Sequence, residues 1–263
     1  MSAPLYMESN GRGPELLLLH GWGLHGGVWD TLVPRLTPKF RVTRIDLPGH
    51  GRSRDVPMPP SLTELTLQTM AAVPPGAVVL GWSLGGLVAL EAALRMPQRL
   101  RGLILANSTP RFITAEDWSC AMPLEQLGQF AQDLAEDYHA TLQNFLSLQV
   151  RGDESARACL RQLRDSLFVH GEADTASLAT GLEILKDSDL RPALKEVSVP
   201  TLVLAGGYDR LTPAAASQYL AAYIPGARLE LFSKSAHAPF ISHTDAFVTA
   251  VLGFIDELDS AAA

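Results

Sequence analysis

The segment VVLGWSLGGLVAL, residues 78–90, places one hydroxyl side chain, Ser83, among glycines between two apolar runs. The first run has the composition of a buried strand and the second that of a helix. Residues 81–85, GWSLG, fit the G-x-S-x-G pattern, in which a sharp strand-to-helix turn lifts the serine hydroxyl above the sheet. A glycine-rich packing turn would give the same letters. The choice depends on whether the chain also supplies a base, an acid and oxyanion donors.

A histidine must accept the serine proton, and His237 is the best placed of the seven histidines. It lies in SKSAHAPF, between the last apolar run and the last helical pattern, and ligand-facing residues of parallel sheets gather at such strand ends. His243 is predicted to cap that helix, and His20 to shape the loop beside it. The remaining histidines are predicted loop or surface residues: His25, His50, His139 and His170.

Asp209 is the candidate for the carboxylate that orients this histidine. In hydrolases with a serine elbow the acid follows a strand between the serine and the histidine, and Asp209 does so directly in VLAGGYDRLTP, residues 203–213. A carboxylate there would fix the imidazole tautomer and stabilise the imidazolium. Other acidic side chains of this interval fall within helical patterns: Asp165, Asp174, Asp187 and Asp189.

Two backbone amides are the predicted oxyanion donors. One belongs to Leu84, the residue after the serine, because this amide has that role at a serine elbow. The second belongs to Trp22, in the loop HGWGLHGG that follows the first central strand. Donors of this kind must be fixed before the reaction begins.

Apolar runs alternate with helical patterns in the first half of the chain and again near its end. Strands are predicted over 15–20, 41–46, 77–82, 100–107, 200–207 and 227–233. Helices are predicted over 26–37, 61–73, 84–95, 213–223 and from Thr244 onward. This alternation predicts a mostly parallel sheet with helices on both faces. Residues 111–190 lack a convincing strand, so we expect a core of residues 1–110 and 191–263 with 111–190 as a helical cap, or lid.

Composition excludes several other classes of protein. The net charge of −7 over 263 residues argues against general binding of nucleic acids, which needs positive charge. No uninterrupted apolar stretch is long enough for a membrane span, and the first apolar run is too short for a secretory signal. Cys120 and Cys159 have neither metal nor disulfide spacing. We expect a cytoplasmic, monomeric enzyme that needs no metal or organic cofactor.

A nucleotide-binding enzyme is the rival prediction. Residues 21–26, GWGLHG, also fit G-x-G-x-x-G, and Asp46 ends the next predicted strand, as in NAD-dependent oxidoreductases. This alternative leaves Ser83, Asp209 and His237 without a role, and the glycine motif alone is weak. A binding protein on an inactive hydrolase scaffold is disfavoured because all three of those residues are present.

The segments HGWG, DLPGHGRS, GWSLGG, GGYDRLTP and AHAPF together resemble the α/β-hydrolase superfamily over the whole chain. FLSLQ, GLEILKDSDLR and AHAPFISH are narrower and are similar to the pimeloyl-[acyl-carrier-protein] methyl ester esterases of biotin synthesis. The resemblance implies hydrolysis of the methyl ester of a pimeloyl chain held on an acyl carrier protein. A broad short-chain carboxylesterase and a carbon–carbon bond hydrolase are the alternatives on this fold. The substrate contacts that the resemblance implies are Trp22, Ser83, Leu84, His237 and the stretch Phe145, Leu146, Ser147, Leu148 and Gln149.

Basic side chains form a stripe in the predicted cap. Residues 153–168 have the pattern of an amphipathic helix, on which Arg157, Arg161 and Arg164 share one face, with Arg151 just upstream. A solvated face is the plainer interpretation. The resemblance favours docking of an acidic carrier protein by these arginines. Ala140 and Asn144 stand where that family has further arginines, whereas Arg157 and Arg161 are retained.

Overall fold

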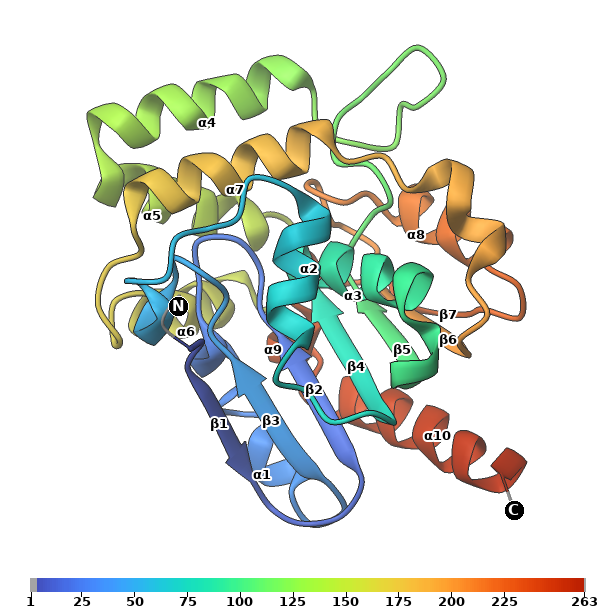
Figure 1. The fold of residues 1–263 in the computed structure, drawn as a ribbon. Coiled ribbons are helices and arrows are strands. Elements are labelled where there is room, and N and C mark those ends of the chain that lie inside the picture. The colour runs from blue at the N-terminus through green and yellow to red at the C-terminus, as the bar shows by residue number, and fades with distance from the viewer. Residues whose placement is uncertain (1–3, 263) are drawn as a thin grey trace.

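The computed structural model describes residues 4–262, so the ends of the predicted core at 1–3 and 263 lie outside the described residues. Its centre is a seven-stranded sheet in the order β1-β3-β2-β4-β5-β6-β7 (Figure 1). The strands are β1 (Met7–Asn10), β2 (Glu15–Leu19), β3 (Arg41–Ile45), β4 (Ala77–Trp82), β5 (Leu100–Ala106), β6 (Thr201–Gly206) and β7 (Arg228–Phe232). β1 pairs antiparallel with β3, and every other pair is parallel. The predicted α/β class is confirmed.

The predicted apolar runs coincide with six of these strands, apart from single residues at their ends. β4 and β6 are buried along their whole length because helices cover both faces of the sheet, which is why their sequences are continuously apolar. The sequence did not predict β1. This strand is a short, half-exposed edge, and its residues MESN contain no apolar run.

Helices cover the two faces of the sheet. In Figure 1, α2 (Leu62–Met70) and α3 (Leu84–Arg95) lie in front of the strands, while α1 (Val33–Leu36) and α10 (Thr244–Ala262) lie behind them. α8 (Ala214–Tyr223) packs on β6 and β7. Short elements complete the core: η2 (Gly51–Ser53), η3 (Pro97–Arg99), η4 (Arg191–Glu196) and α9 (Pro239–Ser242).

The single helix predicted over residues 26–37 is wrong. The structure divides it into the 3-10 turn η1 (Gly26–Trp29) and the four-residue α1. Two glycines begin this segment and Pro34 lies inside it, and these residues weaken or interrupt a continuous helix.

Four helices lie between β5 and β6: α4 (Leu124–Glu136), α5 (Tyr138–Gln149), α6 (Ala156–Leu167) and α7 (Thr175–Asp187). Residues 107–190 are all described and contain isolated bridges but no strand. Figure 1 shows α4, α5 and α7 above the carboxyl ends of the strands. The helix predicted over 153–168 begins only at Ala156, because residues 153–155 form the turn before it.

The parallel register brings several loops to one edge of the sheet. Leu19 of β2 lies beside Gly81 of β4, and Trp82 lies beside Ala106 of β5. The residues that follow these strands therefore meet at the carboxyl edge, where open α/β sheets bind ligands. Within residues 4–262, no helix combines the length and the apolar composition needed to cross a bilayer.

Candidate active site

Ser83 occupies a strained turn between β4 and α3. Its backbone angles, φ 56° and ψ −117°, are rare for a residue other than glycine and cost about 1–3 kcal/mol. The Ser83 amide donates to the Ala106 carbonyl at 3.1 Å, and the Ser108 hydroxyl donates to the Ser83 carbonyl at 2.8 Å. The end of β5 and the residues after it thus hold the turn in place.

Two glycines leave room for this turn. A Cβ atom on Gly81 would overlap the Gly85 carbonyl, and one on Gly85 would overlap the carbonyls of Leu19 and His20. These obstacles are main-chain atoms, which cannot rotate away as a side chain can. A larger residue at either position would displace the turn or β2.

His237 and Asp209 form a buried pair beyond the ends of β7 and β6. The Nδ1 atom of His237 lies 2.7 Å from Oδ2 of Asp209. Asp209 also accepts hydrogen bonds from the amides of Leu211 and Thr212, the Thr212 hydroxyl and the Asn107 side chain. Burial alone would raise the pKa of Asp209, but the His237 ring and these donors outweigh it and lower that pKa. Asp209 is therefore ionised, and Nδ1 of His237 carries the hydrogen between them.

The other ring nitrogen of His237, Nε2, is buried and has no hydrogen-bond partner within residues 4–262. With the hydrogen on Nδ1, it is free to accept a proton. The Trp82 indole donates to the His237 carbonyl at 2.8 Å, and the two ring centroids lie 5.4 Å apart. Trp82 ends β4 and directly precedes Ser83, so the end of this strand connects the hydroxyl to a contact that positions the imidazole.

The loop after β2 runs beside this serine. A Cβ atom on Gly21 would lie 3.2 Å from Cβ of Ser83. Among the described residues, neither the Trp22 amide nor the Leu84 amide donates a hydrogen bond to a protein group. Trp22 follows Gly21 and Leu84 follows Ser83, so two N–H groups without a partner lie next to the point where these segments approach each other. Donors of this kind, fixed in advance, are what an oxyanion requires.

Two buried histidines hold the same loop. His20 accepts the Leu47 amide at Nε2 (2.9 Å) and donates from Nδ1 to the Gly21 carbonyl (2.8 Å). His50 accepts the Gly23 amide at Nε2 (3.1 Å) and donates to a carbonyl of its own loop (2.8 Å). Burial lowers the pKa of His20 to about 3 and that of His50 to about 4, so both are neutral at pH 7. His20 shapes the loop as expected, and His50, expected in a loop or at the surface, is a loop residue that is fully buried.

The remaining histidines lie away from the reacting atoms. His25 is buried, and its Nε2 donates to the Ser166 carbonyl of α6 at 2.7 Å. His139 and His170 lie in the segment between β5 and β6. His243 directly precedes α10. Its ring contacts Ser242 and Glu154 and, among the described residues, accepts no helix amide, so its side chain does not cap the helix.

The glycine pattern at 21–26 lacks the surroundings that a dinucleotide needs. The four-residue turn η1 follows it, where a nucleotide-binding fold would have a helix. Asp46 is fully buried and accepts the Gly26 amide at 2.7 Å and the Arg52 Nε at 2.8 Å. This carboxylate holds its own loop together and is not free for a ribose, which argues against the oxidoreductase alternative.

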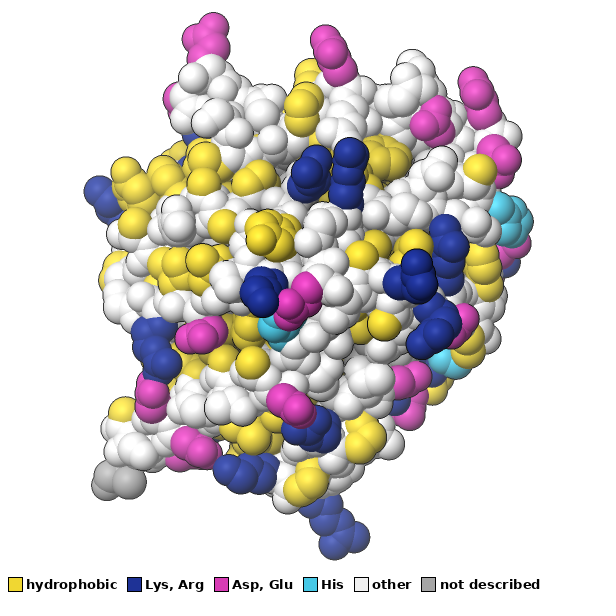
Figure 2. Space-filling view, turned by 180° about the vertical axis from the view of Figure 1, so that it is seen from behind, with side chains coloured by type: hydrophobic (Ala, Val, Ile, Leu, Met, Phe, Trp, Pro, Cys, Tyr) yellow, Lys and Arg dark blue, Asp and Glu magenta, His cyan; other side chains and the backbone are white. Residues whose placement is uncertain are grey.

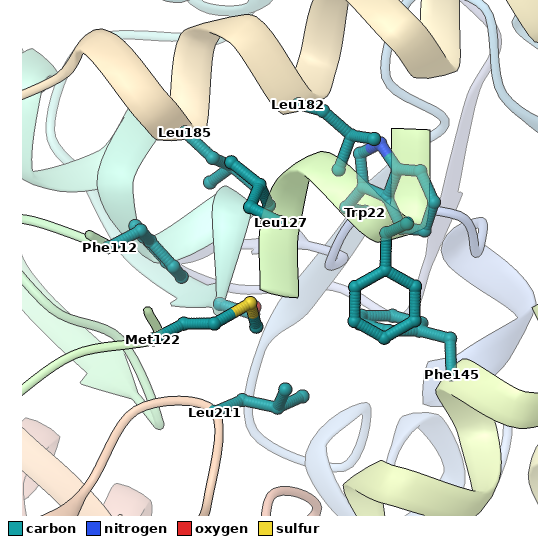
Figure 3. Close-up of a pocket in the computed structure, with 10 residues that line it drawn as sticks. Trp22, Phe112, Met122, Leu127, Phe145, Leu182, Leu185 and Leu211 are labelled. Carbon is teal, nitrogen blue, oxygen red and sulfur yellow. The ribbon is translucent and has the colours of Figure 1, made fainter. Parts of the chain in front are cut away.

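Ser83 lines an apolar cavity, and Figure 3 shows the apolar side chains around it. The Trp22 indole donates to the Leu178 carbonyl of α7 at 2.9 Å, and its ring meets Phe145 edge-on with centroids 5.1 Å apart. No charged side chain is among the described residues that line the cavity. Its apolar lining consists of Trp22, Phe112, Met122, Leu127, Phe130, Phe145, Leu182, Leu185 and Leu211. Such a space suits an uncharged acyl chain.

Comparison with known proteins agrees with this geometry. The family described as the alpha/beta hydrolase fold matches residues 14–244. The chain belongs to the α/β hydrolase family.

This α/β hydrolase is similar to the pimeloyl-[acyl-carrier protein] methyl ester esterase of Xanthomonas oryzae pv. oryzae, with 45% identity over 95% of this chain and 98% of that protein. The esterase of the same name from Nitrosomonas europaea is 43% identical over 94% of this chain and 98% of its own. Among solved structures, an esterase from Exiguobacterium antarcticum has a TM-score of 0.86 at 23% identity, covering 96% of this chain and 95% of that one. The resemblance inferred from the sequence motifs is confirmed.

The five residues of α5 that were predicted to contact the substrate have different contacts in the structure. The stretch consists of Phe145, Leu146, Ser147, Leu148 and Gln149. Phe145 is its one member among the described lining residues of the cavity. The two leucines pack in the apolar core, and the serine hydroxyl donates within its own helix and accepts from Arg164 of α6 at 3.5 Å. Gln149 reaches the site differently, because its carbonyl accepts the His237 amide at 2.9 Å.

The arginines of the predicted stripe are exposed. Arg157, Arg161 and Arg164 lie on the surface of α6, while Cys159, Leu163 and Leu167 are buried on its other face. Arg151 is exposed in the turn before the helix. Among the residues that the structure describes, none of the four arginines has a carboxylate within 4.0 Å. Figure 2 shows basic side chains gathered at the right, on the side that carries α6.

Sequence reasoning missed two side chains of the site. Asn107, at φ 43°, donates to Asp209 at 2.7 Å and to the Ala236 carbonyl at 3.1 Å. Thr212 donates its hydroxyl to Asp209 at 2.6 Å. A signal for Asn107 was present, because it is the polar residue directly after the buried run of β5 and so lies at the carboxyl edge.

Proposed function

We propose that this hydrolase is a serine esterase that cleaves the methyl ester of pimeloyl-[acyl-carrier protein], giving methanol and pimeloyl-[acyl-carrier protein]. The observation that carries the proposal is the buried His237–Asp209 pair, whose free Nε2 belongs to a loop fastened beside Ser83. The substrate follows from the relatives of that name, which match nearly the whole chain at 43% and 45% identity.

In the proposed reaction the Ser83 hydroxyl attacks the ester carbonyl while Nε2 of His237 takes its proton. Asp209 holds the imidazole in the required tautomer and stabilises the imidazolium that forms. The amides of Leu84 and Trp22 bind the oxyanion. The ester C–O bond then breaks, and the imidazolium returns its proton to the methoxide oxygen, which leaves as methanol. Water activated by His237 then hydrolyses the acyl-enzyme and releases the free acid.

The apolar cavity supports an ester over a free acid as the substrate. A methyl ester is neutral, so its chain can be buried against Phe145 and the other apolar side chains without a compensating charge. A carboxylate in the same space would lose its hydration and meet no cation among the described lining residues. The same difference favours release of the product after hydrolysis.

The exposed arginines of α6 support a docking site for the carrier protein. In the proposal, Arg151, Arg157, Arg161 and Arg164 attract an acidic carrier, which presents its acyl chain to the cavity. Arginines without carboxylate neighbours remain available for a partner. Such contacts act mainly on the rate of encounter and on its sensitivity to salt.

The proposal assigns residues 111–190 to a cap over a core formed by 1–110 and 191–263. Support comes from the cavity, because Phe112, Met122 and Phe145 line it from the segment between β5 and β6, while Trp22 and Leu211 line it from the core. The triad, the cavity and the arginines all belong to one chain, so the proposed reaction requires no second copy.

Mass spectrometry of the carrier tests this proposal. The enzyme is incubated with methyl pimeloyl carrier protein, and the intact carrier is analysed. The proposal predicts loss of the methyl group with the acyl chain still attached to the carrier. Cleavage of the thioester, or an unchanged substrate, would contradict it.

A further inference from the structure

The loop that carries His237 is held on its carbonyl side by the core. The Ala236 carbonyl accepts the Asn107 side chain at 3.1 Å, and the His237 carbonyl accepts the Trp82 indole at 2.8 Å. Asn107 follows β5 and Trp82 ends β4, so both donors come from the central strands of the sheet.

The amides of the same two residues point the other way, to the last residue of α5 and the turn that follows it. The Ala236 amide donates to Oδ2 of Asp153 at 2.9 Å, and the His237 amide donates to the Gln149 carbonyl at 2.9 Å. One further hydrogen bond joins these segments, from the Glu154 amide to the Lys234 carbonyl at 3.2 Å. The histidine loop thus lies between two sets of hydrogen bonds, one from the sheet and one from the α5–α6 turn.

Asp153 is the side chain in this second set. It is only 8% exposed, and its other oxygen accepts the Ser155 amide at 2.8 Å. A buried carboxylate loses its hydration, and here two main-chain amides replace the water. Its two oxygens tie the start of α6 to the residue before His237. The bond to Ser155 alone would hold the turn before α6, so the bond to Ala236 serves the histidine loop.

We propose that Asp153 is a positioning residue for His237. By holding the Ala236 amide, it keeps the imidazole in line with Ser83 and Asp209, although it touches neither substrate nor the reacting atoms. The inference rests on the proposed role of these three residues as a catalytic triad. Asp153 also lies between Arg151 and Arg157 in the sequence, so it connects the segment of the proposed docking arginines to the His237 loop.

The test compares Asp153→Ala with Asp137→Ala. Asp137 controls for the loss of a carboxylate at a helix start, because its exposed side chain accepts the Ala140 amide at 2.9 Å at the first residue before α5, the opposite end of that helix from Gln149. Kinetics are measured on p-nitrophenyl butyrate, an activated ester that needs the triad and not the carrier. Asp153→Ala should lower kcat by about tenfold or more with little change in KM, because small displacements of a catalytic group are costly. Asp137→Ala should keep kcat within about twofold.

Equal losses in the two variants, a loss confined to KM, or no loss would overturn the inference. If Asp153→Ala does not fold, Asp153→Asn against Asp137→Asn is judged by the same criteria. The asparagine can still accept one amide but presents N–H groups to the other.

A spectroscopic measurement separates this inference from the proposed function. The His237 Nδ1 proton in its hydrogen bond to Asp209 should give a downfield proton NMR resonance, assigned by its loss in Asp209→Asn. The resonance should persist in Asp137→Ala and be broadened or lost in Asp153→Ala. An unchanged resonance in Asp153→Ala would contradict the positioning role. Failure to hydrolyse any ester would instead contradict the proposed function.

Discussion

The indole N–H of Trp82 donates a 2.8 Å hydrogen bond to the carbonyl oxygen of His237, 155 residues further along the chain. This bond fastens the candidate base to the residue directly before Ser83. The imidazole on its other side meets Asp209 at 2.7 Å. The proposed nucleophile, acid and base therefore follow β4, β6 and β7, three parallel strands of one sheet.

Replacement of Ser83 by alanine should abolish turnover and leave folding intact. Loss of the nucleophile from such a triad costs on the order of 10⁶ in kcat. Alanine has a Cβ atom as serine does, so the backbone strain at φ 56° is unchanged and the melting temperature should hardly move. Ester hydrolysis and thermal unfolding are measured on the same preparation. Turnover within about tenfold of the parent would show that Ser83 is not the nucleophile.

Asp209→Asn should lower kcat by about 10⁴. The amide would present N–H groups where Asp209 now accepts five hydrogen bonds, and it would favour the wrong imidazole tautomer. Steady-state kinetics on a small ester give the loss. Asp46→Asn is the matched comparison, because the oxidoreductase alternative assigns its carboxylate to a cofactor. Tight binding of NAD in a calorimetric titration of the parent enzyme would overturn the ranking of these two alternatives.

The free energy of unfolding should fall as the pH drops from about 6.5 toward 4.5. Burial lowers the pKa of His20 to about 3 and of His50 to about 4, so the unfolded chain binds protons in this range that the folded chain does not. The contribution of the two neutral histidines to the free energy of unfolding is fully present above the unfolded pKa near 6.5. It is lost progressively as the pH falls from there toward their folded pKa values. Asp46, whose pKa is lowered to about 2, loses its contribution only below about pH 4.

Urea unfolding at about pH 7 and about pH 5 measures this difference. The two histidines together should lower the free energy of unfolding by about 3–4 kcal/mol. Equal stability at the two pH values would contradict the neutral, buried state of His20 and His50.

Arg157→Glu combined with Arg161→Glu should slow hydrolysis of the carrier-bound ester by about tenfold and spare a small free ester. The reversal of charge opposes the approach of an acidic carrier but leaves the cavity intact. The control is Arg12→Glu with Arg228→Glu, which makes the same change of net charge. These two residues lie at the amino ends of β2 and β7, away from the carboxyl edge that carries the site, so hydrolysis of neither substrate should change. If the α6 variant slows both substrates equally, or neither, these arginines are not the docking site.

Much of the site could be predicted from local sequence. The strand–turn–helix at Ser83 and the residues after β6 and β7 are decided by short segments, because a buried strand and the turn after it have strong patterns of their own. The carboxyl-edge rule then brings Ser83, Asp209 and His237 together without knowledge of any long-range contact.

The contacts that hold these residues could not be predicted in the same way. Asp153 meets Ala236 across 83 residues, and His20 meets Leu47 across 27. Neither pair shares a pattern, since each depends on how two loops pack once the sheet has formed. The helix predicted at 26–37 divides for a local reason, because two glycines and Pro34 together interrupt it.

The most direct test of the central claim is a comparison of kcat/KM for methyl pimeloyl carrier protein and for free methyl butyrate. Both esters have the same leaving group, so the chemistry at Ser83 is matched and the difference reports recognition of the acyl chain and its carrier. The proposed function predicts a much higher kcat/KM for the carrier-bound ester, with a gap that narrows as salt is added. An equal or higher kcat/KM for free methyl butyrate would contradict it and identify a broad short-chain carboxylesterase.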